Sequence, residues 1–135
     1  MRWVLPLSLA LLSTPAALQA DWKQIGSTVD DSVYFMDPER IKVVGTKKHV
    51  WVKVDHSRDR SVTYRESMRL LSFDCDKQQS KLLYYNSTDS YGKSVKSQNF
   101  PDYGSSIGYS PIVPDSIGET ISRLACYDPA SQVQN

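Results

Sequence analysis

The chain has 135 residues, which is enough for one domain and too few for a two-domain enzyme. Its 16 lysines and arginines nearly balance its 15 aspartates and glutamates, so the formal net charge is +1. A near-neutral domain has no overall electrostatic field that would capture nucleic acid or an anionic membrane, and we expect neither as a partner. The charged and aromatic contents, 23% and 10%, are typical of a folded globular domain and argue against disorder.

Residues 1–20 have the three-part pattern of a secretory signal peptide. A positive start at Arg2 is followed by an apolar run over residues 3–12 and by a segment rich in small residues. The apolar run is too short for a membrane span, which needs about 20 residues, and no later stretch is suitable either. We therefore expect an exported protein, periplasmic or secreted, that begins near Asp21. No cysteine for lipidation stands at this junction. The alternative is a buried N-terminal helix.

Residues 21–99 alternate short β-rich segments with turn residues, a pattern typical of antiparallel strands joined by short links. We expect strands over residues 21–25, 32–36, 41–44, 49–55, 64–75 and 81–86, with 92–97 as a further candidate. Residues 45–48 predict a hairpin turn, and the Gly-, Ser- and Pro-rich residues 100–111 predict a loop. The sequence thus predicts an antiparallel meander sheet of about six strands.

The strand over residues 49–55 predicts two different faces, because successive side chains point to opposite sides of a sheet. Its valines share one face, and the other face carries His49, Trp51, Lys53 and Asp55. In the strand over residues 64–75, alternation puts Leu71 and Phe73 on the side of Cys75. Together with a helix described next, these positions predict a core that includes Val50, Val52, Val54, Leu71, Phe73, Ile117, Ile121 and Leu124.

Residues 114–126 predict the only helix. Ser116 and Glu119 form a capping box, in which each side chain accepts a hydrogen bond from a backbone N–H at the helix start. Ile117, Ile121 and Leu124 follow at i, i+4 and i+7, which places them on one apolar stripe. Residues 128–135 are polar and predict a C-terminal tail. The fold class is therefore α+β, with one C-terminal helix beside the sheet.

Cys75 and Cys126 are the only cysteines. An even number of cysteines in an exported protein favours a disulfide, and here it would tie the C-terminal helix to the sheet. A bridge that closes a loop of about 50 residues stabilises the fold by roughly 4 kcal/mol in the chain-entropy model. The alternatives are two free thiols or a zinc site with the two histidines, although no C-x-x-C or H-x-x-x-H spacing is present.

His49 and His56 are the only histidines, and their odd separation would place them on opposite faces of a continuous strand. A joint metal site is therefore not expected. Either one is a candidate haem ligand or pH-sensitive group, and the alternative is a solvated histidine at a strand end. We likewise expect Asp74 and Asp76 to be solvated turn residues.

Four further residues are candidates for ligand binding. Lys47 and Lys48 adjoin His49 and form a small basic cluster that suits an acidic ligand, or is simply solvated. Tyr103 and Tyr109 lie among aromatic residues near the predicted loop, and exposed tyrosines are favoured in protein recognition. No signature of a metal or nucleotide cofactor is present.

Residues 104–108 match the G-x-S-x-G pattern of a hydrolase nucleophile, with Ser106 at its centre. That nucleophile needs a buried strand before it and a helix after it, and the flanking Gly-, Ser- and Pro-rich sequence predicts neither. We therefore expect no catalysis. A hydrolase is the most distant alternative.

A set of spaced residues resembles one known family. It consists of Trp22, Ile25-Gly26, Val33-Tyr34, Asp37, Ile41, Gly45, Val50-Trp51, Tyr64, Ser67, Asp74-Cys75, Pro114, Ser116, Gly118-Glu119 and Cys126. Their order and spacing resemble the surface-adhesin protein E family over nearly all of residues 21–127. The resemblance implies a six-stranded antiparallel sheet flanked by a C-terminal helix and tied to it by the disulfide. It also implies adhesion to host matrix proteins such as vitronectin and laminin, haem binding and dimer formation.

These observations predict a signal peptide over residues 1–20, an adhesin-like domain over 21–127 and a tail over 128–135. We expect a non-catalytic, exported binding module whose partner is a protein, with an extracellular-matrix protein or a second copy of the chain as candidates. No cofactor is expected, and haem or another small ligand is the alternative. An envelope accessory protein is the other alternative.

Overall fold

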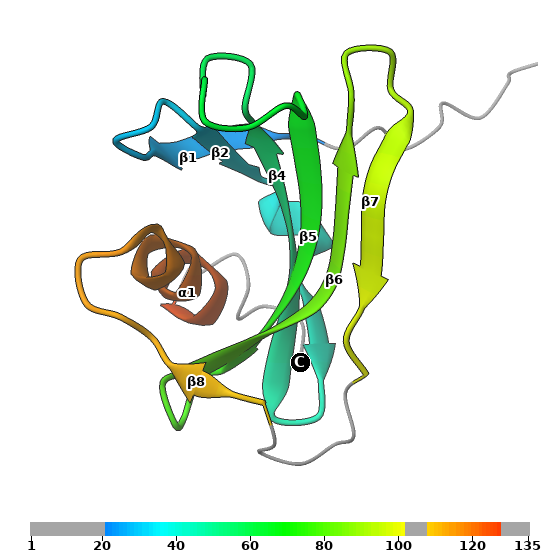
Figure 1. The fold of residues 1–135 in the computed structure, drawn as a ribbon. Coiled ribbons are helices and arrows are strands. Elements are labelled where there is room, and N and C mark those ends of the chain that lie inside the picture. The colour runs from blue at the N-terminus through cyan, green and yellow to red at the C-terminus, as the bar shows by residue number, and fades with distance from the viewer. Residues whose placement is uncertain (1–20, 102–107, 128–135) are drawn as a thin grey trace, which may run out of the picture.

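The computed structural model describes residues 21–101 and 108–127 (Figure 1). The predicted signal peptide and C-terminal tail, together with Tyr103 and Ser106, lie outside these residues. The strands are β1 (Lys23–Ser27), β2 (Val33–Met36), β3 (Lys42–Val44), β4 (Lys47–Asp55), β5 (Glu66–Asp74), β6 (Gln79–Thr88), β7 (Ser94–Asn99) and β8 (Ser110–Pro111). The helices are a single 3-10 turn, η1 (Pro38–Arg40), and α1 (Ile117–Tyr127).

All the strands of the described residues join one antiparallel sheet, which confirms the predicted fold class. Its main path runs in the order β1-β2-β4-β5-β6-β7, while β3 pairs with β4 and β8 pairs with β6. The two-residue β8 lies inside the segment predicted as a loop. It escapes prediction because Pro111, which lacks an N–H donor, is atypical of a strand and is tolerated only at an edge.

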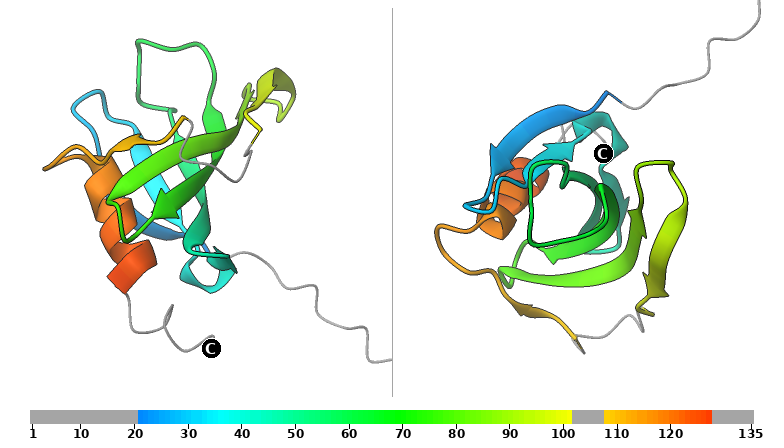
Figure 2. Two further views of the ribbon diagram at one scale, coloured as in Figure 1. Left: turned by 90° about the horizontal axis from the view of Figure 1, so that it is seen from below. Right: turned by 45° about the horizontal axis from the view of Figure 1, so that its top comes forward.

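The long strands β4, β5 and β6 curve, and α1 lies within the curve on one side of the sheet (Figure 1 and Figure 2). We call the side that packs against α1 the inner face, and the opposite side the outer face. Val50, Val52 and Val54 point to the inner face, and each is 0% exposed. His49, Trp51 and Lys53 alternate with them and therefore point to the outer face.

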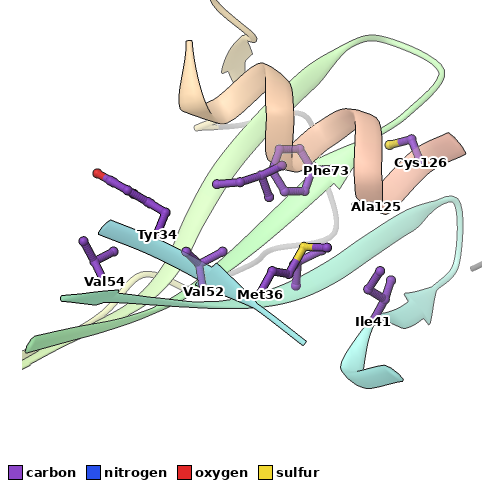
Figure 3. Close-up of a cluster of buried hydrophobic side chains, with 10 residues drawn as sticks. Tyr34, Met36, Ile41, Val52, Val54, Phe73, Ala125 and Cys126 are labelled. Atoms are coloured by element: carbon purple, nitrogen blue, oxygen red, sulfur yellow. The ribbon is translucent and has the colours of Figure 1, made fainter. Parts of the chain in front are cut away.

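The core lies between the inner face and α1. Phe73 lies beneath the helix, near Ala125 (Figure 3). The predicted Val50, Val52, Val54, Phe73 and Ile121 are fully or almost fully buried, and Leu71, Ile117 and Leu124 are partly buried against them. The core also contains Tyr34, Met36, Ile41 and Ala125, which the alternation did not single out.

A β-bulge in β6 changes which of its residues face inward. Leu70 lies opposite Tyr84 and Leu71 lies opposite Leu82, so Leu83 is the extra residue of the bulge. The bulge shifts the alternation by one residue, and Tyr85 reaches the inner face opposite Arg69. A strict period of two would have placed Tyr85 outside.

The start of α1 forms a capping arrangement close to the predicted one. Ser116 Oγ accepts a hydrogen bond from the Glu119 N–H at 3.2 Å, as expected. The Glu119 carboxylate accepts from the Asp115 N–H at 2.9 Å and not from Ser116, so the return bond lies one residue earlier than in a standard box. Gly26 of β1 allows the helix to approach, since a Cβ there would lie 2.8 Å from Ile117 Cδ1.

Cys75 and Cys126 form the predicted disulfide, with their Cα atoms 5.8 Å apart. Cys75 follows β5 and Cys126 stands in the last turn of α1, so the bond fastens the helix to the sheet. Neither cysteine is free, which overturns the alternatives of two thiols or a zinc site. Asp74, predicted as solvated, is instead 8% exposed, and its carboxylate accepts a hydrogen bond from the Lys77 N–H across the β5–β6 turn.

Replacing both cysteines by alanine (C75A with C126A) should lower the free energy of unfolding by about 3–4 kcal/mol, because the bond closes a long loop in the unfolded chain. Urea denaturation followed by circular dichroism measures the loss. Reducing agent should destabilise the wild type by a similar amount and leave the double variant unchanged. Equal midpoints for oxidised wild type and double variant would contradict the structural importance of this bond.

Candidate functional site

The outer face carries a group of aromatic side chains around one lysine. The Lys53 ammonium lies 5.3 Å from the ring centre of Trp22 and 5.2 Å from that of Phe35, both within the range of cation–π attraction. On the same face, Trp51 and Tyr84 make an edge-to-face contact with ring centres 5.7 Å apart. These half-buried rings come from the N-terminal segment, β2, β4 and β6, so the face is assembled from distant parts of the chain.

A pocket of about 360 Å³ adjoins this aromatic group. It is lined by Arg40, Lys42, His49, Trp51 and Leu70. Lys42 lies directly opposite His49 in the β3–β4 ladder, and the Arg40 guanidinium lies 3.2 Å from the Asp37 carboxylate. The pocket therefore combines an imidazole, two cations and an aromatic wall, a set that suits an anionic or acidic group of a ligand.

The structure brings two more predicted residues together at the same end of the sheet. The Lys47 ammonium lies 4.1 Å from the ring centre of Tyr109, and the Tyr109 hydroxyl donates to Ser72 Oγ at 2.8 Å. Ser72 lies opposite His49 in the β4–β5 ladder. Lys47, His49 and Tyr109 thus gather on the outer face. Lys48 does not join them, because it lies opposite the core residue Phe73 and points to the inner side.

His56 is buried, with 5% of its surface exposed, so the expectation of a solvated histidine is wrong for this residue. Its Nδ1 lies 2.9 Å from Ser32 Oγ, and its Nε2 lies 2.9 Å from Ser67 Oγ. Ser32 Oγ in turn donates to the Asp59 carboxylate at 3.1 Å. Both ring nitrogens are therefore occupied by hydrogen bonds that join β5 to the loops at residues 28–32 and 56–65.

The surroundings of His56 favour its neutral form. Burial is the largest cause that lowers its pKa, and the positive charge of Arg69 lowers it further. The carboxylates of Asp59, Asp30 and Asp55 act in the opposite direction and do not outweigh these effects. His56 is therefore a structural, uncharged member of a hydrogen-bonded chain.

This lowered pKa predicts a loss of stability in mild acid. The unfolded chain, with a histidine pKa of about 6.5, binds the proton more readily than the folded chain. The His56 contribution is thus present above about pH 6.5 and is lost as the pH falls toward the lower folded-state pKa. Urea denaturation between about pH 7.5 and pH 5 should show a declining free energy of unfolding in wild type.

The variant His56→Gln should flatten that decline, and His49→Gln serves as the matched control that keeps it. If wild type and His56→Gln show the same pH dependence of the free energy of unfolding, His56 is not the group responsible for the decline.

The described residues contain no cluster of three or more His, Cys, Asp or Glu side chains that could hold a metal ion. Within the same ranges, no helix is long and apolar enough to cross a membrane. Tyr103, the remaining candidate, lies outside them.

Sequence reasoning identified Lys47, His49 and Tyr109 but missed Trp22, Phe35 and Lys53 as one cluster. The alternation in β4 does indicate that Trp51 and Lys53 lie on the face away from the buried valines. The sequence pattern does not give the strand register, which pairs Phe35 of β2 with Lys53 of β4.

Comparison with known proteins gives one match. The family model described as surface-adhesin protein E matches residues 22–127, most of the chain. No curated protein and no solved structure shows a significant match.

Proposed function

Since the chain belongs to the surface-adhesin protein E family, we propose that it binds a protein partner through the outer face of its sheet. Membership of this family suggests a binding role and an exported protein, and it favours no catalytic activity. The partner class that we propose is an extracellular-matrix protein with an acidic segment. Contact with such a partner requires that the exported chain leave the periplasm, so this proposal favours secretion.

The observation that carries the proposal is the placement of Lys53 between Trp22 and Phe35, beside the Trp51–Tyr84 pair. Tryptophan and tyrosine contribute most of the binding energy in many protein interfaces. The lysines add the charge complementarity that selects acidic partners and accelerates association. Lys42 is exposed beside this group, at the rim where such charges act.

Binding to immobilised vitronectin and laminin tests this proposal directly. Trp51→Ala and Lys53→Glu should each weaken binding at least about tenfold, the effect expected for central interface residues. Added salt should weaken wild-type binding, because the proposed attraction is partly electrostatic. Lys96→Glu is the matched charge-reversal control, since Lys96 is exposed on β7 at a position that faces the other side of the sheet.

Unchanged binding in the folded Trp51→Ala and Lys53→Glu variants would exclude the outer face as the binding surface for matrix proteins. If the wild type does not bind matrix proteins and binds only periplasmic proteins from an envelope extract, the role of an envelope accessory protein is favoured instead. Circular dichroism of each variant separates a loss of binding from a loss of folding.

Haem is a second candidate ligand, and the pocket with His49 is the arrangement that favours it. The imidazole would be the iron ligand, while Arg40 and Lys42 would meet the propionates and Trp51 would contact the ring. His56 is unsuitable, because both of its ring nitrogens are hydrogen-bonded within the core. Homodimer formation stays a prediction, for which the exposed edge strand β7 is the candidate pairing edge.

Titration with hemin tests the second candidate. A Soret band should develop with wild type and His56→Ala and should be lost in His49→Ala. The absence of any spectral change with wild type, or a band that survives in His49→Ala, would remove this assignment.

A further inference from the structure

A cavity of about 420 Å³ lies between the inner face of the sheet and α1. Its apolar wall is formed by Val52, Leu71, Phe73, Leu82, Ile117 and Ile121. This size and lining are typical of small-molecule sites, which combine apolar walls with a few oriented polar groups. The cavity is separate from the outer face, because its walls belong to the opposite side of the same strands.

One cation, Arg69, lines this cavity, together with the polar side chains of Ser80 and three tyrosines. Its guanidinium carbon lies 5.7 Å from the ring centres of both Tyr34 and Tyr85, so the group is held between two aromatic rings. Its Nε is buried without a hydrogen-bond partner. Within residues 21–101 and 108–127, Arg69 makes no ion pair.

Aromatic contacts hold the guanidinium in place but do not use its N–H donors. Arginine has five such donors in a planar fork, and it stays charged at all physiological pH values. A carboxylate fits this fork with two parallel hydrogen bonds, which makes it the preferred partner of a positioned arginine. Arg69 is thus arranged to receive an anionic group from a ligand.

None of the described acidic side chains near Arg69 forms an ion pair with it. A hydrogen bond with the Tyr85 side chain, followed by burial, raises the pKa of Tyr64 to about 12, so this phenol lining the cavity remains neutral. The nearby Asp59 carboxylate already accepts hydrogen bonds from Ser32 and Ser61. No described acidic side chain lines the cavity.

We propose that this cavity binds a small amphiphile with one carboxylate and an apolar body, of the size of a medium-chain fatty acid. The carboxylate accepts hydrogen bonds from Arg69, and the apolar body lies between Leu71 and Phe73 on the sheet and Ile117 and Ile121 on the helix. This site does not rest on the proposed function, because the two use opposite faces of the sheet. The chain would thus bind a small carboxylate amphiphile in addition to a protein partner.

Isothermal titration of the oxidised chain with decanoate, below its micelle concentration, tests the proposal. Wild type should bind decanoate, and Arg69→Gln should bind it at least about tenfold more weakly, because the charged hydrogen bonds are lost. Decyltrimethylammonium, which has the same chain and the opposite charge, should bind poorly to wild type. Arg58→Gln, at an exposed loop position, is the matched control and should bind decanoate like wild type.

A second variant keeps the test independent of any folding defect in Arg69→Gln. Leu82→Trp adds bulk to the sheet wall of the cavity and should also abolish decanoate binding, while circular dichroism reports whether the fold is retained. Matrix and hemin binding should persist in both variants. Three results would each overturn the proposal. The wild type could show no binding of decanoate, it could bind decanoate and decyltrimethylammonium with equal affinity, or folded Arg69→Gln could bind decanoate as tightly as the wild type.

Discussion

The disulfide between Cys75 and Cys126 is the constraint on which the rest of the molecule depends. It joins the turn after β5 to the last turn of α1 and so fixes one end of the helix on the sheet. The other end is held where Ile117 approaches Gly26 of β1. A short helix anchored at both ends can cover a curved sheet without filling all the space beneath it, and the cavity with Arg69 lies in that space.

The two faces of the sheet differ in chemistry because each strand sends alternate side chains to opposite sides. The inner face is largely apolar and packs against α1, with three fully buried valines from β4 alone. The outer face carries rings and lysines, among them Trp51 and Lys53 from the same strand. A single nine-residue strand therefore contributes both to the core and to the surface that we propose for partner binding.

The buried His56 and the half-buried Arg69, beside and on β5, differ in how their polar groups are bonded. His56 has hydrogen-bond partners at both ring nitrogens and is kept neutral, which makes it part of the scaffold. Arg69 cannot become neutral, and its contacts among the described residues are aromatic faces. The hydrogen bonds of His56 are thus complete, whereas the N–H donors of Arg69 are the ones that we propose for ligand binding.

The sequence by itself determined the features that depend on neighbouring residues. Alternation predicted the strands of the main sheet path and the two faces of β4, but not β8. The Ser116–Glu119 spacing predicted the start of the helix, and the two cysteines predicted the single covalent link. The spaced residues that resemble the surface-adhesin family were confirmed by the family match over residues 22–127.

Only the tertiary structure decided which distant residues meet. Three features depend on how the strands pair. They are the bulge that turns Tyr85 inward, the burial of His56 against Ser32 and Ser67, and the contact of Lys47 with Tyr109. Register is set by pairing between segments far apart in the chain, and a pattern that repeats every two residues contains no information about which partner lies opposite. Local periodicity therefore identifies the faces of a strand, while the sites on those faces exist only once the strands are paired.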